Sequence, residues 1–264
     1  MRKPLWRKKF LSPEILISVS TFVVIITLWF VVARTERLPS ALFPGPGKVW
    51  RGFLEMLSTG YKSHTILEHL LYSFRRLFIA YFIAALCAVL LGLASGYNRI
   101  VRAVVDPLVE FYQAIPPLSY FTLLVIWLGI FEASKIALLF LAAFAPIFIA
   151  SMSGVKSVRG DFINGAMTLG ANKMQIFLHI ILPASLPYIF TGLRTAMATA
   201  YGTLVAAEMV AAVSGIGWLV FDASRYLRTD LVFMGIIIMG ITSLLLDRGI
   251  RFIEKKVVPW KGKE

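Results

Sequence analysis

Long uncharged apolar runs constrain the fold of this chain more than any other feature of its sequence. The first run, Ile15–Ala33, carries no charge and is long enough to cross the apolar core of a bilayer, which is about 30 Å thick. A chain inside lipid must satisfy its backbone hydrogen bonds within itself, so runs of this kind form helices. Hydrophobic residues make up 58% of the 264 positions and charged residues 16%. The sequence therefore predicts an all-α, polytopic membrane protein.

Six apolar runs have the length of transmembrane helices. The third run contains Asp106 and Glu110 and then two successive prolines, Pro116 and Pro117, in mid-course. Because proline lacks a backbone donor and clashes with the preceding turn, a helix must kink or break there. The six predicted spans are Ile15–Ala33, Leu77–Tyr97, Ala103–Phe131, Ile136–Val155, Leu186–Val213 and Leu231–Leu246.

The longest polar segment, Arg34–Arg76, separates the first two spans. Prolines and glycines break its beginning, and the apolar residues of Lys48–Leu57 recur with helical spacing. This pattern predicts an amphipathic helix on the membrane surface. We divide the single transmembrane domain, residues 1–264, into residues 1–69 with the first span and the external helix, a core at residues 70–255, and a loop within that core at residues 156–182.

The positions of the basic residues predict the orientation of the chain. The net charge is +13, but the lysines and arginines gather at the ends of apolar runs, which is typical of topology signals rather than of nucleic-acid binding. The segments on the N-terminal side of the membrane carry more lysine and arginine than those on the opposite side. Because such residues are enriched in cytoplasmic loops, both termini and the segment Lys156–Gln175 are expected to be cytoplasmic.

A short polar segment with small side chains, Asn164–Gly170, lies between the fourth and fifth spans. Asp161 is suited to cap a helix that begins just after it, and Gly170 permits a sharp turn where that helix ends. A second helical stretch, Lys173–Ile181, then leads to Pro183 near the start of the next span. A short helix between two turns on the membrane surface is either a lever that a partner protein grips or an ordinary amphipathic linker.

The order of these residues resembles the cytoplasmic coupling loop of ABC importer permeases, in which small residues and a glycine precede a sequence like Ile180-Ile181-Leu182-Pro183. This chain has Asn164-Gly165-Ala166 where that family usually has Glu-Ala-Ala. Further motifs resemble the branch of these permeases that serves taurine, aliphatic sulfonates, nitrate and bicarbonate. Within that branch, the sequence Glu110–Pro117 and the C-terminal sequence Val258-Pro259-Trp260 are most similar to taurine permease subunits. Those further motifs are Phe43-Pro44-Gly45-Pro46, Pro116-Pro117-Leu118, Val125–Ile130, Ala145-Pro146-Ile147, Gly154–Val158, Gly192-Leu193-Arg194, Ala206-Ala207-Glu208 and Thr229-Asp230.

The resemblance implies the type I ABC importer permease fold, with six transmembrane helices and a cytoplasmic coupling helix, in the inner membrane of a bacterium. It implies three partners: a second copy of this chain, two ABC ATPase subunits at the cytoplasmic loop, and an extracytoplasmic solute-binding protein. ATP and Mg would be bound by the ATPase, and this chain would hold no cofactor and perform no catalysis. The coupling residues that it implies are Asp161, Asn164, Gly165, Ala166, Thr168, Gly170 and Pro183.

The implied function is the import of taurine or a related sulfonate. Alkanesulfonate, nitrate and bicarbonate remain alternative solutes, and an ATP-independent secondary transporter or channel is a more distant alternative. The sequence shows no metal-ligand spacing, no Ser/His/Asp cluster and no phosphate-binding glycine loop, which argues against a membrane-embedded enzyme.

Two further sets of residues are candidate sites, one for the solute pathway and one for docking of the binding protein. Each set also has a purely structural interpretation. Glu208 lies deep in the fifth span, where a charge is costly, so it either lines the pathway or bonds one helix to another. Arg194 either holds the bundle together or attracts an anionic substrate. The residues near the double proline either line a passage or satisfy freed carbonyls, and the outer charges either dock a binding protein or are simply solvated. The pathway candidates are Gln113, Pro116, Pro117, Ser119, Thr203 and Glu208, and the docking candidates are Asp222, Arg225, Arg228 and Asp230.

Overall fold

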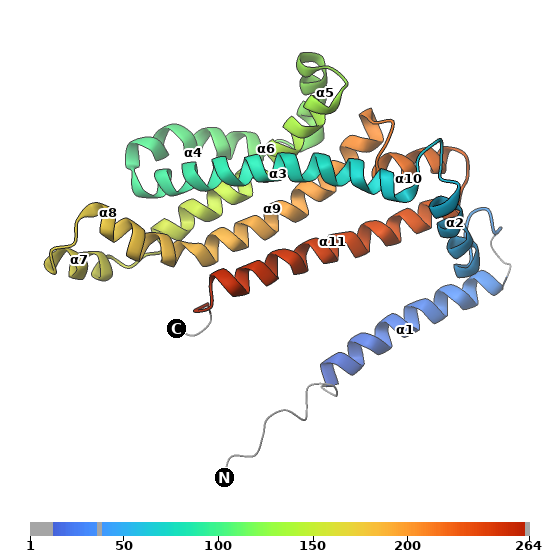
Figure 1. Cartoon of the computed structure of the whole chain (residues 1–264), viewed down its shortest axis with the longest axis horizontal. Coiled ribbons are helices and arrows are strands. Elements are labelled where there is room, and N and C mark those ends of the chain that lie inside the picture. The colour runs from blue at the N-terminus through green and yellow to red at the C-terminus, as the bar shows by residue number, and fades with distance from the viewer. Residues whose placement is uncertain (1–12, 36–38, 262–264) are drawn as a thin grey trace, which may run out of the picture.

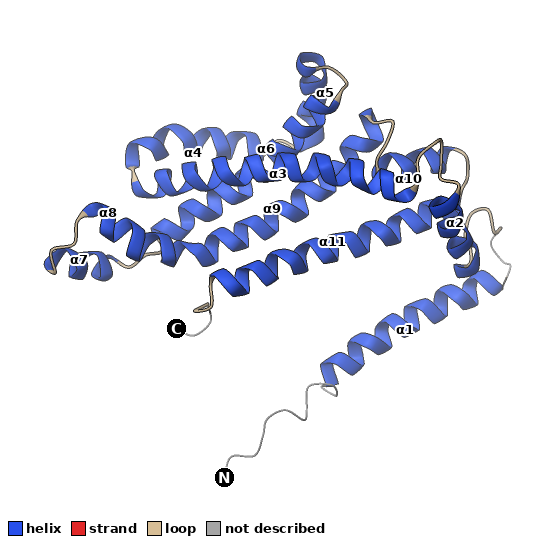
Figure 2. Cartoon of the chain, viewed as in Figure 1, coloured by secondary structure: helices blue, strands red, loops and turns tan. Residues whose placement is uncertain are grey.

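The computed structural model describes residues 13–35 and 39–261, and these residues form helices without a strand among them (Figure 1, Figure 2). The fold is therefore all-α, as predicted. The helices are α1 (Pro13–Arg34), α2 (Pro46–Ser58), α3 (Ile66–Tyr97), α4 (Arg99–Gln113), α5 (Pro117–Leu128), α6 (Glu132–Lys156), α7 (Gly160–Thr168), α8 (Lys173–Ile176), a π-helical turn (Phe177–Ile181), α9 (Leu182–Ala211), α10 (Ile216–Arg225) and α11 (Thr229–Val257).

Five helical segments in the described part of the chain are long and apolar enough to cross a membrane: α1, α3, α6, the continuous run Lys173–Ala211, and α11. The pair α4 and α5 passes the same test as a single broken span, bent by 103°. With that pair counted, the six predicted spans are present. The predicted break is confirmed, since α4 ends at Gln113 and α5 begins at Pro117.

Two predicted boundaries are wrong. Helix α11 continues to Val257, past the predicted end of the sixth span at Leu246. The second spanning helix begins at Ile66 instead of Leu77, so Arg75 and Arg76 lie inside α3 and not in the external segment. The reason is a capping box, in which the Thr65 hydroxyl accepts from the Glu68 backbone N–H at 3.4 Å and the Glu68 carboxylate accepts from the Thr65 N–H at 2.6 Å. This reciprocal pair satisfies two donors that a helix start otherwise leaves free, which moves the helix start upstream.

The core of the bundle consists of α3, α6 and α9, which lie side by side in Figure 1, with α11 along α9. Alanines let the helices approach closely: Ala84, Ala143 and Ala196 are fully buried. At Gly192 a Cβ would lie 2.5 Å from the Cβ of Ala150 and 3.1 Å from the carbonyl of Pro146. Close approach through small residues replaces the hydrophobic driving force that helices lack in lipid.

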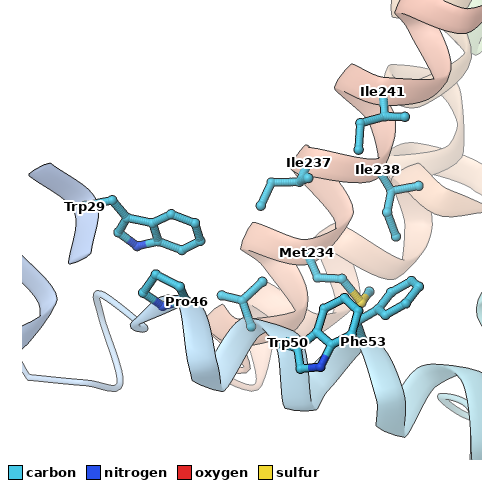
Figure 3. A pocket seen from close by; sticks show the side chains of 9 residues that line it. Trp29, Pro46, Trp50, Phe53, Met234, Ile237, Ile238 and Ile241 are labelled. Carbon is cyan, nitrogen blue, oxygen red and sulfur yellow. The ribbon is translucent and has the colours of Figure 1, made fainter. Parts of the chain in front are cut away.

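The first span, α1, leaves the bundle, and no residue of its apolar stretch within Leu16–Arg34 is buried (Figure 1). Trp29 attaches it near its C-terminal end, where the indole N–H donates to the carbonyl of Pro44 at 3.0 Å and the ring stacks on Phe233. The predicted amphipathic helix is confirmed as α2, which packs Val49 and Met56 against α10 and α11. Figure 3 shows Trp29 facing Phe53 and Met234 across an apolar hollow of about 310 Å³.

We expect Gly192→Ala to destabilise the chain by about 1–3 kcal/mol, because the new methyl group overpacks the α6–α9 contact. The matched change on the same helix is Gly202→Ala, where a Cβ meets nothing within 4 Å. That variant should be neutral or slightly stabilising, since alanine favours helix. Thermal unfolding of the detergent-purified chain, followed by circular dichroism, measures both, and equal melting temperatures for the two variants would contradict the packing account.

Candidate functional site

The segment α7–α8 projects from one end of the bundle (Figure 1). No residue of α7 is fully buried. Phe162 and Met167 are exposed, and Leu169 after the helix is 90% exposed, whereas Ile163 packs against the core at the base of the segment. The predicted turn is present at Gly170, whose φ of +83° is a left-handed conformation that glycine adopts without strain. Its N–H donates to the carbonyl of Met167 at 2.9 Å, and the next N–H, of Ala171, donates to Ala166 at 3.0 Å. These bonds close the end of α7.

The expected capping role of Asp161 is wrong. Helix α7 begins at Gly160, two residues before the predicted start at Phe162, and its N-cap residue is Arg159, which makes no side-chain capping bond. Asp161 lies instead in the first turn, where the helix dipole stabilises a negative charge. Its carboxylate accepts a hydrogen bond from the Arg159 guanidinium at 3.1 Å. Four more coupling candidates lie in this helix: Asn164, Gly165 and Thr168 are exposed and Ala166 is half-buried.

The base of the segment is held firmly. Asn172 and Gln175 form a capping box that starts α8, with bonds of 2.9 and 2.8 Å. Ile176 and Ile181 are buried. The π-helical turn then joins α9, and Pro183 lies in the first turn of α9, as predicted. Lys173–Ala211 is one continuous helical segment that includes the π-helical turn, so the exposed segment leads directly into α9.

A buried ionic cluster lies toward the other end of α9. Glu208 is fully buried, and its carboxylate accepts from the Arg76 guanidinium of α3 at 2.7 Å. Arg76, 2% exposed, also donates twice to Glu132 at the start of α6, at 2.6 and 2.9 Å. It donates further to the carbonyl of Ser214 at 2.7 Å. One guanidinium thus bonds α3 to α6, to α9 and to the loop before α10.

Helix α3 and the first turn of α10 also bond the same carboxylate. Glu208 accepts from the Ser73 hydroxyl at 2.7 Å and from the Gly217 backbone N–H at 2.9 Å. Gly215 has a φ of +124°, and a Cβ there would collide with the Glu208 carboxylate. Glu208 therefore makes bonds from helix to helix, which is one of its two alternative roles. Its contribution to a pathway stays a prediction.

The other pathway candidates come from two places. Gln113, Pro116 and Ser119 are exposed at the corner between α4 and α5, and Thr203 is buried on α9, where its hydroxyl donates to the carbonyl of Thr199. Pro117 begins α5. The two places are linked through Phe121 of α5, which packs beside Ala207 and so next to Glu208.

The docking candidates are divided between buried and exposed positions. Asp222 of α10 is 8% exposed, and it accepts from Lys62 at 2.7 Å and from the Tyr61 hydroxyl at 2.9 Å. Burial raises the pKa of the Asp222 carboxyl, but the bonds from Lys62 and Tyr61 outweigh it and hold that pKa below its usual value. Burial and the neighbouring Asp222 raise the pKa of Tyr61 to about 12. Arg225 stays exposed, over the ring of Phe221.

The remaining docking candidates, Arg228 and Asp230, pair with each other at 3.0 Å, and Arg228 also bonds Glu55 of α2 at 2.8 Å. These ion pairs fix α2 to the start of α11. Toward the opposite end of α11, Arg194 donates to Asp247 at 2.9 Å, so it holds α9 against α11, the first of its two alternative roles.

Sequence reasoning missed several members of these clusters. Arg76 was assigned to the external segment, although the pattern Thr65-x-x-Glu68 is a capping-box signal that places it inside a helix. Lys62 and Glu132 have partners more than 50 residues away, so no local pattern identifies them. Among the described residues, no group of three His, Cys, Asp or Glu side chains is arranged to hold a metal ion.

Comparison with known proteins gives concordant results. Residues 84–259 match the family described as binding-protein-dependent transport system inner membrane component. The chain is 39% identical to the taurine transport system permease protein TauC of Escherichia coli (strain K12), over 99% of this chain and 95% of that protein. It is 29% identical to the putative aliphatic sulfonates transport permease protein SsuC of Bacillus subtilis (strain 168), over 97% and 88%. A chain of the inward-facing MetNI methionine ABC transporter shares the fold, with a TM-score of 0.54, 18% identity, and coverage of 70% of this chain and 92% of that chain.

Arg76→Gln should lower the free energy of unfolding by about 3–5 kcal/mol, because it leaves the buried Glu208 carboxylate without its cation. The matched control is Arg75→Gln, one residue earlier and exposed, which should leave the melting temperature unchanged. Thermal unfolding in detergent measures both. The double variant Arg76→Gln/Glu208→Gln should recover part of the loss, since both charges are then gone. Additive losses in the double variant would contradict the pairing.

The Lys62–Asp222–Tyr61 contact should make stability depend on pH. Because the folded pKa of Asp222 is depressed, its stabilisation is complete above the ordinary value of 3.8 and disappears as the pH falls through the lower folded value. The melting temperature of Asp222→Asn should therefore lie below that of the parent by a constant amount from about pH 5 to about pH 8, and the difference should vanish in stronger acid. Asp161→Asn, an exposed aspartate at the other end, is the control. A difference that grows toward low pH would refute this assignment.

Proposed function

The chain belongs to the family of binding-protein-dependent transport system inner membrane components, and from that membership we propose that it carries taurine or a related sulfonate through the membrane as the permease subunit of an ABC importer. The observation that carries the choice of solute is the 39% identity to a taurine permease along nearly the whole of both chains. The similarity to a protein named for aliphatic sulfonates keeps alkanesulfonates as the second candidate.

We propose that the exposed segment around α7 is the surface that two ATPase subunits grip, one on each copy of a homodimer. Its uncovered apolar side chains, among them Phe162, Met167 and Leu169, support a docking role, because exposed apolar groups gather where a partner covers them. ATP and Mg would be bound by the ATPase, and this chain would supply the pathway and the lever without a covalent step.

The unbroken helix Lys173–Ala211 gives the lever its mechanics. It has 39 residues, which at 1.5 Å per residue is a rod of about 58 Å. Its first turns carry the exposed segment, and Glu208 lies close to its last turn, in the bonds to Arg76 and Ser73. Closure of the ATPases would shift the near end of the rod, and the clamped far end would carry α3 and the start of α10 with it. The binding protein would then release solute at that far end.

Uptake of labelled taurine into proteoliposomes that contain this chain, its ATPase and its binding protein tests the proposal. ATP-dependent uptake of taurine is expected. Uptake of an alkanesulfonate, nitrate or bicarbonate in its place would keep the importer and replace the solute. Uptake without the ATPase and the binding protein would overturn the importer and favour a secondary transporter or channel.

Leu169→Asp should reduce uptake and co-purification of the ATPase at least about tenfold, because a carboxylate desolvated at a docking surface costs more than 1.4 kcal/mol. The matched control is Leu67→Asp. Leu67 is an exposed leucine in the first turn of α3, where the helix dipole stabilises a carboxylate. It should keep the ATPase bound. Equal ATPase binding by the two variants would contradict the coupling role.

We propose that both chain termini and α7 lie in the cytoplasm, on the support of the basic residues near those segments. Cys87 is the single cysteine, so the variant Cys87→Ala/Leu169→Cys carries one exposed thiol. A membrane-impermeant maleimide should label it in inverted vesicles and leave it unlabelled in right-side-out vesicles. The opposite pattern would reverse the orientation.

A further inference from the structure

Two adjoining hollows on α11 differ sharply in chemistry. The first is a groove of about 440 Å³ between α3, α9 and α11. Its walls are apolar except for Tyr81, whose hydroxyl is already used, since it donates to the carbonyl of Leu193 at 2.9 Å. The groove residues that matter here are Phe82, Leu193, Leu246, Gly249, Ile250 and Ile253.

The second hollow, of about 300 Å³, follows the groove toward the C-terminal end of α11 and is basic. Its charged walls are Arg194, Arg251, Glu254, Lys255 and Lys261. The two hollows are contiguous along two helices, because Leu193 and Ile250 line the groove while the next residue of each helix lines the basic hollow. An apolar groove therefore lies beside a cluster of cations.

Two guanidiniums in the basic hollow keep donors free. Arg194 and Arg251 each give only the Nε–H to Asp247, at 2.9 and 2.7 Å, one to each carboxylate oxygen. Asp247 thereby holds both side chains in place, and in the described part of the chain the terminal amino groups of both guanidiniums have no hydrogen-bond partner. Lys255 has no carboxylate partner there either, whereas Glu254 is neutralised by Lys261 at 2.5 Å. The hollow offers a set of oriented donors with excess positive charge.

We propose that the two hollows together bind one anionic phospholipid, with an acyl chain in the groove and the phosphate on Arg194, Arg251 and Lys255. A guanidinium donates two parallel N–H bonds to a pair of phosphate oxygens. The excess positive charge then favours a head group with a net negative charge over a zwitterionic one. Basic hollows between membrane helices hold lipid head groups for the same reason. The order of the two hollows along α11 is that of a lipid, with the charge where the helix leaves its apolar stretch.

Native mass spectrometry of the full chain tests the head group. The probes are a phosphatidylglycerol and a phosphatidylcholine with identical acyl chains. The chain should retain the phosphatidylglycerol at least about tenfold more tightly, because only the anionic head group leaves the cations with a net partner. Arg251→Gln should reduce that retention about tenfold, since a hydrogen bond to a charged group is lost. Arg248→Gln, an exposed arginine on the same helix outside the hollow, should retain the lipid like the parent.

A second pair of variants tests the groove without disturbing the fold. Gly249 lines the groove, and a Cβ there meets nothing within 4 Å, so Gly249→Leu fills the groove and should also lower phosphatidylglycerol retention about tenfold. Gly240→Leu is the same change on α11, at an equally open position that does not line the groove, and should have no effect.

Three results would overturn the proposal. Equal retention of the two lipids would remove the role of charge, and equal losses in Arg248→Gln and Arg251→Gln would show attraction to the general basic surface. If Gly249→Leu weakened self-association of the chain and left lipid retention intact, a second copy would cover the groove in place of a lipid.

Discussion

The fold depends on one buried charge. A carboxylate inside a membrane helix is strongly unfavourable unless it is paired and fully bonded. Glu208 of α9 meets that condition because α3 and the start of α10 converge on it. Arg76 completes the arrangement by reaching Glu132 as well. The relative positions of four elements are therefore set by the bonding requirements of one ion pair, and a shift of any of them would leave a charge unsatisfied in an apolar surrounding.

Close helix packing and this ion pair act at different depths of the bundle. Through its middle, α3, α6 and α9 meet through alanine and glycine, so the backbones are near one another and sliding is restricted by contact. Toward one end the Arg76–Glu208 ion pair also fixes the orientation of the helices, because a guanidinium donates its hydrogen bonds only in its own plane. Toward the other end the chain leaves the bundle in the exposed segment around α7, held by the Asn172–Gln175 capping box. The chain is thus closely packed and bonded toward the Glu208 end and exposed around α7.

Local signals made most of the fold predictable. Apolar length gave the spans, Pro116 and Pro117 gave the break between α4 and α5, and Gly170 gave the turn after α7. The failures were of two kinds. The start of α3 has a capping box that was not recognised, and α10 lies between the fifth and sixth predicted spans, where no helix was predicted. The partners of Arg76 and Lys62, in contrast, lie 132 and 160 positions away, so pairing of this kind depends on how the helices are placed, and no window of sequence contains it.

The unbroken run from the capping box at Asn172 to the Glu208 cluster has a thermodynamic consequence. Because the run is one continuous helix, with a π-helical turn at Phe177–Ile181, the positions of its two ends depend on each other. Any molecule that binds one end and prefers one of those positions changes the affinity at the other end, and the reverse effect has the same magnitude. Binding at the α7 end and binding at the Glu208 end would then be two measures of a single equilibrium.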